Sequence, residues 1–300
     1  ILPELYSRLR QSLETITEDF ELVLVEDCGT DDSWNAIKDL AIKDPRIKGI
    51  KFSRNFGQHF GITAGLDHCD GDWIVVMDCD LQDRPEDIPL LYNKALEGYD
   101  IVTAKRSKRK HPPLKKLTSW MFYRTFSLMS GVNYDWQIGN FKIVSRKVVD
   151  SFRMMREQFR FFSAMIDWMG FETVSVEVQH ASRESGKSTY TVKKLFKLAA
   201  DTIIAYSTRP LTMCVVIGFI IAFFAFIYGG WILYRAVFQG IPVQGWSSLI
   251  ISLYFLSGLI IAILGVIGIY LGRIYFECKA RPLYIVREKV NLPEKTNTPG

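Results

Sequence analysis

The segment 78–83 places carboxylates and an amide directly after an apolar run, a pattern typical of a ligand site at the end of a strand. The run 73–77 reads as a buried strand, and in open α/β sheets ligands bind beyond the carboxyl ends of the strands. Asp78 and Asp80 offer hard oxygen ligands, to which the Gln82 amide oxygen adds a third. This set suits Mg²⁺ or Mn²⁺, which would keep other coordination positions for water and substrate phosphates. The alternative is an acidic turn that caps the following helix.

Composition divides the chain into a polar first two-thirds and an apolar last third. No charged residue lies between Arg209 and Arg235, or between Arg235 and Arg273. We expect transmembrane helices at 210–235 and 247–272, because each run is long enough to cross a hydrocarbon core about 30 Å thick. Burial inside a large soluble protein is the alternative, but two such runs joined by a short Gly/Pro turn favour a membrane hairpin.

Cations flank the two expected spans on their outer sides. The connecting turn, by contrast, has only Arg235 beside it. The positive-inside rule therefore predicts that both chain ends are cytoplasmic. The flanking cations are Lys193, Lys194, Lys197 and Arg209 before the first span, and Arg273, Lys279, Arg281 and Arg287 after the second.

The net charge and the cysteine content limit the classes of partner and the cellular compartment that we expect. A net charge of +5 fits a protein that works beside an anionic leaflet, and it is too small and too dispersed to indicate nucleic acid. The five cysteines show no paired spacing, as expected in a reducing compartment, and the four histidines suggest no zinc site. The lipid bilayer is therefore an expected partner, and nucleic acid is not.

The polar part alternates apolar runs with segments of helical spacing. This alternation predicts a doubly wound, mostly parallel α/β sheet, and apolar runs suit parallel strands buried on both faces. The expected strands are 20–25, 47–52, 73–77 and 100–104, and the expected helices are 33–42, 57–68 and 85–97. Residues 1–5 already read as the beginning of a helix, so we expect that a first strand precedes this sequence.

Residues 190–207 carry apolar positions at helical spacing, with lysines to the other side. We expect an interfacial amphipathic helix at 190–209; a helix packed in an ordinary core is the alternative. The chain then divides into a catalytic domain at 1–189, this helix, the two spans, and a cytoplasmic tail at 273–300.

Four ordered motifs resemble those of the inverting GT-A glycosyltransferases of family two. With the two spans, the set is similar to the polyprenyl-phosphate type, which includes the bactoprenol glucosyltransferases and dolichol-phosphate mannose synthase. The resemblance covers nearly all 300 residues. The motifs are Val25-Glu26-Asp27-Cys28-Gly29-Thr30-Asp31-Asp32-Ser33, Ser53-Arg54-Asn55-Phe56-Gly57-Gln58-His59, Asp78-Cys79-Asp80-Leu81-Gln82-Asp83-x-Pro85-Glu86, and Arg183-x-x-Gly186-x-Ser188-x-Tyr190.

The sequence also departs from this family pattern. Glu26 stands where the family usually has Asp, Cys28 where it has Gly, Arg84 where it often has Pro, and Thr189 where it often has Lys. The family's opening strand, with a nucleotide-binding segment, is not in this sequence, so part of the base pocket cannot be read from it.

The resemblance implies inverting transfer of a hexose from a nucleotide-sugar donor to polyprenyl phosphate, on the cytoplasmic face of a membrane such as the bacterial inner membrane. Glucose from UDP-glucose is the expected pair; mannose from GDP-mannose or a modified aminoarabinose are alternatives. A processive polysaccharide synthase is disfavoured because the sequence has no Gln-x-x-Arg-Trp motif. A non-catalytic membrane scaffold is disfavoured by the intact motifs. A homo-oligomer is left open.

The same resemblance assigns the site residues. Asp80, with Asp78 and Gln82, is expected to hold a divalent cation that neutralises the diphosphate leaving group. Asp135 is the expected base or acceptor-orienting residue, although it could instead bond the turn before Phe141. The expected donor-binding residues are Glu26, Asp27, Asp78, Arg183, Ser188 and Tyr190. The alternatives are a capping role for Asp27 at the helix near Ser33 and a plain solvent loop at 183–190.

Arg106 and Arg124 are the expected ligands of the acceptor phosphate. Arg106 follows the strand 100–104, and Arg124 shares a helical face with apolar residues in the segment 114–129. A cation on such a face needs an anionic partner, either the lipid phosphate or an internal Asp. Because a phosphate monoester is already anionic near neutral pH, we expect positioning and charge compensation to matter more than a strong base.

Overall fold

The computed structural model describes residues 1–106, 138–178, 207–239 and 245–293. These residues belong to two compact units. The first contains 1–106, 138–178 and 281–293, and the second contains 207–239 and 245–280. Most of the expected interfacial helix at 190–209 lies outside the described residues.

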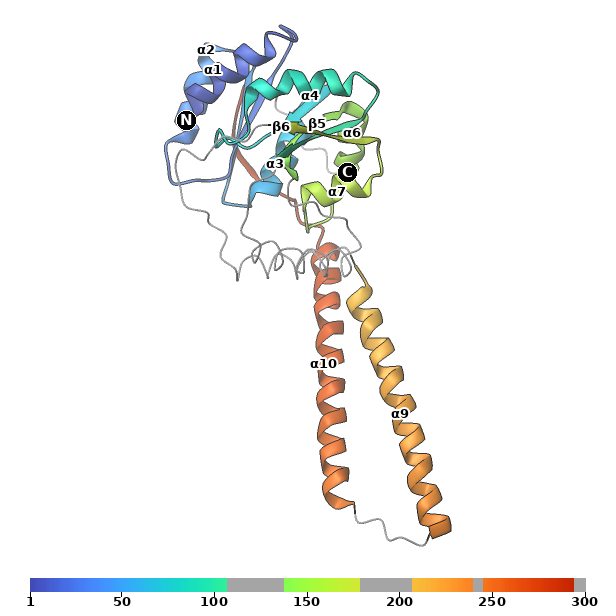
Figure 1. Cartoon of the computed structure of the whole chain (residues 1–300). Helices are drawn as coiled ribbons and strands as arrows, with labels where there is room; N and C mark the ends of the chain where they lie inside the picture. Colours follow the sequence, from blue (N-terminus) through green and yellow to red (C-terminus); the bar gives the residue numbers. More distant parts are fainter. Residues whose placement is uncertain (107–137, 179–206, 240–244, 294–300) are drawn as a thin grey trace. The chain divides into compact units, whose positions relative to one another are not determined.

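The first unit alternates helices and strands from its beginning (Figure 1). Up to residue 106 every expected element is confirmed, with bounds that differ by at most about two residues. The elements are α1 (Leu2–Leu13), β1 (Leu22–Glu26), α2 (Ser33–Lys43), β2 (Ile47–Phe52), α3 (Gln58–His68), β3 (Trp73–Val76), the 3₁₀ helix η1 (Pro85–Asp87), α4 (Ile88–Ala95) and β4 (Ile101–Arg106). Elements that the sequence did not predict follow: β5 (Ile138–Ser145), α6 (Arg146–Met154), α7 (Phe162–Trp168), β6 (Thr173–Val178) and β7 (Val286–Val290).

The described strands form two mixed sheets, in the orders β1-β2-β7 and β3-β5-β4-β6. The pairs β1–β2 and β4–β6 are parallel. The pairs β2–β7, β3–β5 and β4–β5 are antiparallel. The expected α/β sheet is confirmed, but its pairing is mixed rather than mostly parallel, because β5 and β7 run against their neighbours.

Helices cover both faces of each sheet, as a doubly wound fold requires. On the second sheet, alternate residues such as Phe141 and Ile143 of β5 pack with α1 and α4 in one apolar cluster. The intervening Lys142 instead contacts Phe162 and Ser163 of α7 on the opposite face. On the first sheet, α2 and α1 cover one face and α3 the other.

Lys142 is a charged residue in the middle of this core, with only 1 % of its surface exposed. Its Nζ donates to Ser163 Oγ at 3.4 Å and lies 5.1 Å from the centre of the Phe162 ring. Burial lowers the pKa of the Lys142 ammonium to about 8, while the nearby Asp167 carboxylate opposes the shift. The folded protein therefore holds this proton less tightly than an unfolded chain does.

We expect Lys142→Met to raise the thermal unfolding midpoint of the detergent-purified protein at neutral pH. Burying an ammonium is unfavourable, and a well-packed apolar side chain of similar volume removes that cost. The gain should be about 1–3 kcal/mol at pH 7. It should shrink as the pH rises from about 8 to the ordinary lysine value of 10.5, where both states become neutral.

Intrinsic fluorescence melts across this pH range measure the effect, and Lys43→Met, at an exposed position of α2, is the matched control. The control should show no such pH-dependent gain. A lower midpoint for Lys142→Met at pH 7 would mean that the ammonium stabilises the core through Ser163 and Phe162.

The second unit consists of two long apolar helices that run side by side, α9 (Arg209–Gln239) and α10 (Trp246–Cys278) (Figure 1). They contain the expected spans, and both extend beyond them. Their apolar side chains are exposed, as Phe226 at 83 % and Ile261 at 69 % illustrate. Exposure of this kind disfavours the alternative of helices buried in a soluble core, and both helices are long and apolar enough to cross a membrane.

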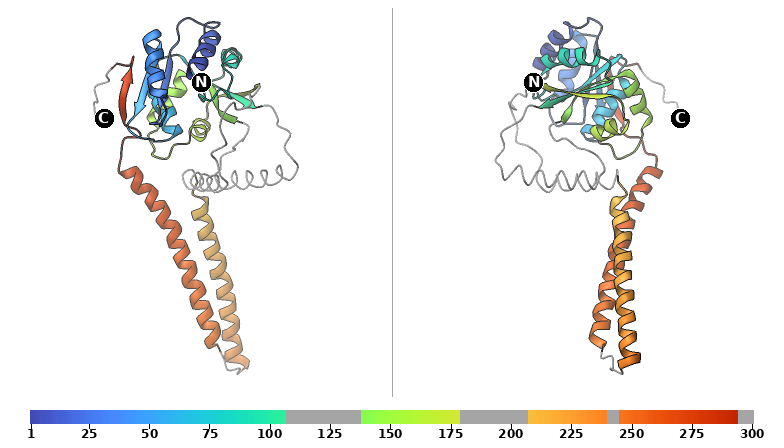
Figure 2. Two further views of the ribbon diagram at one scale, coloured as in Figure 1. Left: turned by 90° about the vertical axis from the view of Figure 1, so that its left-hand side faces the viewer. Right: turned by 45° about the vertical axis from the view of Figure 1, so that its right-hand side comes forward.

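The segment 273–300, expected as a tail, has two structured parts. Its first residues complete α10, and Val286–Val290 form β7, which pairs with β2 of the first unit (Figure 2). Side chains reinforce this pairing: Trp34 Nε1 donates to Glu288 Oε2 at 2.8 Å, and Asn291 Nδ2 donates to the Ala41 and Ile47 carbonyls. The chain that leaves α10 is therefore an integral strand of the first unit.

Candidate functional site

Strand pairing brings several of the predicted residues to one edge of the second sheet. β5 lies between β3 and β4 and is antiparallel to both, so the ends of β3 and β4 and the beginning of β5 share an edge. Val76 pairs with Lys142, two residues before Asp78, and Lys105 pairs with Ile138, one residue before Arg106. Asp78 and the Arg106 backbone therefore lie at the same edge.

The turn after β3 has a fixed shape that presents Asp80. The Gln82 backbone N–H donates to Asp80 Oδ1 at 3.1 Å. Leu81 adopts a left-handed backbone conformation with φ 59°, which is unfavourable for a non-glycine residue. Its side chain compensates by burial in the apolar cluster beneath α1 and α4. Neither η1 nor α4 receives a side-chain cap, so the structure does not support the alternative of an acidic capping turn.

The donor set at this turn fits a hard divalent cation. Asp78 and Asp80 supply carboxylates, and Gln82 supplies an amide oxygen in the same short turn. Among the described residues, no group of three or more His, Cys, Asp or Glu side chains gathers as a closed metal site. Mg²⁺ commonly uses one or two protein carboxylates together with substrate phosphates, so a closed protein cage is not required.

Glu26 ends β1 and has one carboxylate oxygen without a protein partner among the described residues. Its Oε1 accepts a hydrogen bond from the Gly29 N–H at 2.5 Å, which tightens the turn after the strand. Its Oε2 is buried and makes no hydrogen bond to any described residue, although only 7 % of the residue is exposed. A buried acceptor of this kind is unfavourable unless a ligand supplies a donor.

Asp27 holds the turn that leads into α3. Its two carboxylate oxygens accept hydrogen bonds from the Phe56 N–H at 2.6 Å and the Gly57 N–H at 2.7 Å. Asn55 Nδ2 also donates to the Asp27 carbonyl at 3.1 Å. The hypothesis that Asp27 caps the helix near Ser33 is not supported, because α2 has Asp32 at its N-cap and no side-chain cap bond.

Cys28 shows how the chain accommodates one departure from the family pattern. Its φ of 54° lies in the left-handed region that glycine adopts freely. The cysteine therefore occupies a glycine conformation at a cost of about 1–2 kcal/mol. The turn after β1 thus keeps its course although the glycine is replaced. Cys28 and the other four cysteines, all within the described residues, are free.

His59, in the first turn of α3, is an uncharged residue at physiological pH. Burial lowers its pKa to about 4, and the nearby Arg160 guanidinium adds to the shift. The Phe162 N–H points to its Nδ1 at 3.4 Å, and the Phe161 ring packs edge-on at 5.3 Å. His59 therefore joins α3 to the beginning of α7, and it is not poised to exchange protons near neutral pH.

Several predicted site residues cannot be placed. Arg106 ends β4 and pairs with Val178, but only its backbone is described. The remaining five lie outside the described residues: Arg124, Asp135, Arg183, Ser188 and Tyr190. Of the expected site, the structure thus describes the side chains of Glu26, Asp27, Asp78, Asp80 and Gln82.

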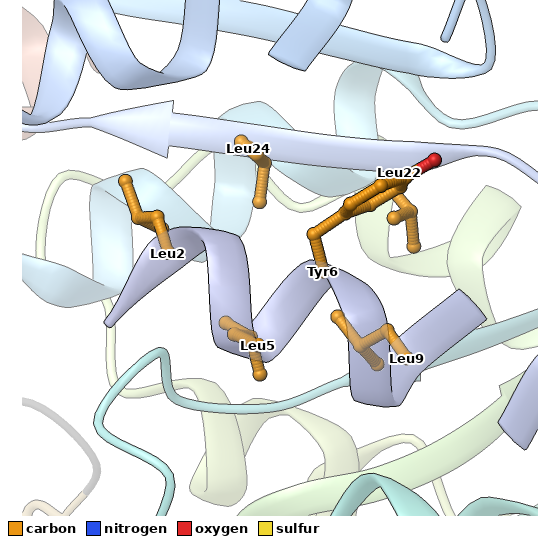
Figure 3. A pocket seen from close by; sticks show the side chains of 6 residues that line it. All are labelled: Leu2, Leu5, Tyr6, Leu9, Leu22 and Leu24. Atoms are coloured by element: carbon orange, nitrogen blue, oxygen red, sulfur yellow. The ribbon is translucent and has the colours of Figure 1, made fainter. Parts of the chain in front are cut away.

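A small pocket between α1 and β1 does not belong to this site. Figure 3 shows that leucines and one tyrosine line it. It offers no charged group for a nucleotide or a diphosphate. The lining residues are Leu2, Leu5, Tyr6, Leu9, Leu22 and Leu24.

Side-chain contacts at the two ends of α3 were missed by sequence reasoning. Gln58 Nε2 donates to Asp78 Oδ1 at 2.8 Å, which joins the beginning of α3 to the end of β3. Tyr284, just before β7, donates to Asp67 Oδ2 at 2.8 Å, and Arg156 bonds both oxygens of the same carboxylate. Gln58 lies in the second motif, but only the folded chain shows what it contacts.

The structure thus shows an α/β domain with carboxylates beyond the ends of its strands, in a chain that also has two long apolar helices. A family model described as Glycosyl transferase family 2 matches residues 2–168. That match covers more than half of the chain, which therefore belongs to glycosyl transferase family 2.

Full-length relatives support this membership. The chain is 40% identical over 296 residues to the uncharacterized glycosyltransferase YkcC of Bacillus subtilis strain 168, covering 98% of this chain and 92% of that protein. It is 37% identical over 289 residues to the bactoprenol glucosyl transferase of Shigella phage SfV, covering 96% and 94%. It is 34% identical over 288 residues to the uncharacterized glycosyltransferase sll0501 of Synechocystis, covering 96% and 91%.

Proposed function

We propose that this protein transfers a hexose from a nucleotide-sugar donor to the phosphate of a polyprenyl phosphate, with inversion at the anomeric carbon. The observation that carries the proposal is the Asp78–Asp80 turn beyond β3, in a family 2 domain whose chain continues into two long apolar helices. Relatives that match nearly the whole chain are named bactoprenol glucosyl transferases, which supports glucose as the sugar and a polyprenyl phosphate as the acceptor.

Asp78 and Asp80 are proposed to hold a divalent cation, Mg²⁺ or Mn²⁺, with help from Gln82. When bound, this cation supplies positive charge to the diphosphate as the glycosidic bond breaks. The protein's own contribution is orientation: the Gln82 N–H bond to Asp80 and the Gln58 bond to Asp78 hold both carboxylates at the sheet edge. Such preorganised charge is commonly the largest contribution to catalysis.

The nucleoside of the donor is proposed to bind beside the end of β1. The buried Oε2 of Glu26 is an acceptor suited to a ribose hydroxyl or a base N–H. Asp27 contributes by fixing the turn through Phe56 and Gly57. Arg183, Ser188 and Tyr190 are proposed to bind the donor from their loop.

The acceptor is proposed to enter at the same edge of the second sheet. Arg106 and Arg124 are the proposed ligands of the lipid phosphate, and Asp135 is the proposed base or orienting residue. A phosphate monoester carries its negative charge already near neutral pH, so its oxygen can attack the anomeric carbon without prior loss of a proton. The rate then depends mainly on charge compensation by the arginines and on the alignment of the phosphate oxygen with the anomeric carbon.

The catalytic domain and both chain ends are proposed to face the cytoplasm. β7 follows α10 but pairs with β2, which precedes α9. If each apolar helix crosses the membrane once, the chain must return to the side on which it began. The cations that flank the hairpin favour the cytoplasm as this side. The same side also contains the nucleotide sugars that the reaction needs.

A donor panel tests the proposal. The purified full-length chain, in vesicles that contain polyprenyl phosphate, should convert radiolabelled UDP-glucose into an organic-extractable product. UDP-galactose, GDP-mannose and a nucleotide-linked aminoarabinose should give much less, and vesicles without the lipid phosphate are the control. Product from GDP-mannose alone would overturn the choice of donor, and no lipid product from any donor would contradict the proposed reaction.

A further inference from the structure

We infer that Gln58 is a positioning residue for Asp78, acting from a helix start that Asp27 holds in place. Gln58 is the first residue of α3, and its Nε2 donates to Asp78 Oδ1 at 2.8 Å. The inference rests on the proposed function, because it assigns Asp78 to the donor and cation site. It adds a specific task for a side chain that is not among the proposed substrate ligands.

The contact matters because β1 and β3 belong to different sheets. β1 pairs with β2, and β3 pairs with β5, so the described residues show no backbone ladder between β1 and β3. Yet the proposed donor and cation groups follow the ends of these two strands. The hydrogen bond between Gln58 and Asp78 links the start of α3 to the end of β3. The Asp27 bonds to Phe56 and Gly57 link the same helix start to the end of β1.

The helix start from which Gln58 reaches Asp78 is itself fixed. Asp27 accepts hydrogen bonds from the Phe56 and Gly57 N–H groups, at 2.6 and 2.7 Å. Bonds to a charged carboxylate are stronger than neutral ones. Gly57 has φ 106°, which only glycine adopts readily. The end of β1 therefore sets the position of the backbone that carries Gln58.

Gln58 can orient Asp78 without blocking it. A carboxylate has about four acceptor positions, so the amide of Gln58 occupies only one of them while it restricts the rotation of the group. The Gln58 side chain is also exposed. An exposed hydrogen bond contributes little to global stability, so its loss should affect the site more than the fold.

The test is donor binding, measured by titration calorimetry of UDP-glucose with Mg²⁺ on the full-length protein. We expect Gln58→Leu to weaken binding about tenfold, the equivalent of one lost charge-assisted hydrogen bond. Asp78→Ala should weaken it at least as much. In the double variant the Gln58 substitution should add less than about twofold, because its effect passes through Asp78. In turnover assays the donor KM should rise more than kcat falls.

A matched glycine pair separates positioning from general destabilisation. Gly57 and Gly98 both have a positive φ, 106° and 110°, and an added Cβ meets no atom within 4 Å at either. Substitution by Ala therefore strains the backbone at both positions without a steric clash. Only Gly57→Ala should weaken donor binding, because Gly98 lies in the turn between α4 and β4.

The outcomes are distinguishable. Unchanged donor binding in Gln58→Leu, with a clear loss in Asp78→Ala, would overturn the positioning role and leave the proposed site intact. An undiminished effect of Gln58→Leu in the Asp78→Ala background would also overturn it. Unchanged binding in Asp78→Ala would contradict the proposed donor site itself.

Discussion

Asp80→Ala should lower the rate of sugar transfer by about 10²–10³-fold while the protein remains folded and in the membrane. The turn after β3 directs this carboxylate by the Gln82 N–H bond, and the proposed cation needs it to neutralise the diphosphate. Removing one such preorganised stabiliser typically costs about 3–4 kcal/mol of barrier, or a rate loss of 10²–10³-fold. Initial rates with saturating donor and acceptor, together with the unfolding midpoint, measure both parts of the prediction.

Asp72→Ala is the matched control for this variant. Asp72 is exposed and lies immediately before β3, at the other end of the strand from Asp80. Its substitution by Ala removes the same charge. Its rate should equal that of the wild type. The wild-type activity should also vanish in EDTA and return with Mg²⁺ or Mn²⁺. Full activity of Asp80→Ala, or of the wild type in chelator, would refute the cation site.

A cysteine at position 240 should react with a membrane-impermeant maleimide in intact cells, whereas a cysteine at position 287 should not. Gly240 follows the end of α9, in the connection between the two apolar helices. Arg287 lies on β7, where its side chain is 62% exposed, so only the membrane should protect it. Because β7 pairs with β2, the segments before and after the hairpin must lie on the same side.

Permeabilised cells provide the control, since both positions should then react. Labelling of position 287 in intact cells, with position 240 protected, would reverse the orientation and place the site away from cytoplasmic nucleotide sugars. Protection of both positions in intact cells would indicate that the helices do not form a hairpin across the membrane.

Local sequence signals predicted the first half of the domain well. The run Ile47–Phe52 is apolar and bounded by turn residues, and β2 has the same bounds. The apolar spacing of residues 33–42 predicted α2, which the structure has at Ser33–Lys43. These signals are local, so they depend little on the rest of the fold.

The pairing of strands depended on contacts that are distant in sequence. β7 reads Val-Arg-Glu-Lys-Val, so its charges suggested a solvated tail, although an edge strand can expose the same pattern. Lys142 likewise made β5 difficult to predict, because a lysine rarely lies in a buried strand. The antiparallel neighbours of β2 and β3 therefore could not be predicted.

The candidate site was predicted in its residue types but not in its contacts. Asp78 and Asp80 lie beyond β3 as the motif suggested. Asp27 was expected at the donor or at the helix near Ser33. The structure shows its carboxylate accepting from Phe56 and Gly57, and its role toward the donor stays a prediction. Those partners are about thirty residues away, and only the pairing of β1 with β2 brings them together.

Two acceptors that differ only in the phosphate test most directly whether a lipid phosphate receives the sugar. Vesicles containing either polyprenyl phosphate or the corresponding polyprenol are incubated with the purified protein, Mg²⁺ and radiolabelled UDP-glucose, and the organic phase is counted. We expect label in the lipid only when the phosphate is present, in a product that mild acid cleaves to free sugar. Equal transfer to polyprenol, or label that appears only in a water-soluble polymer, would contradict this expectation.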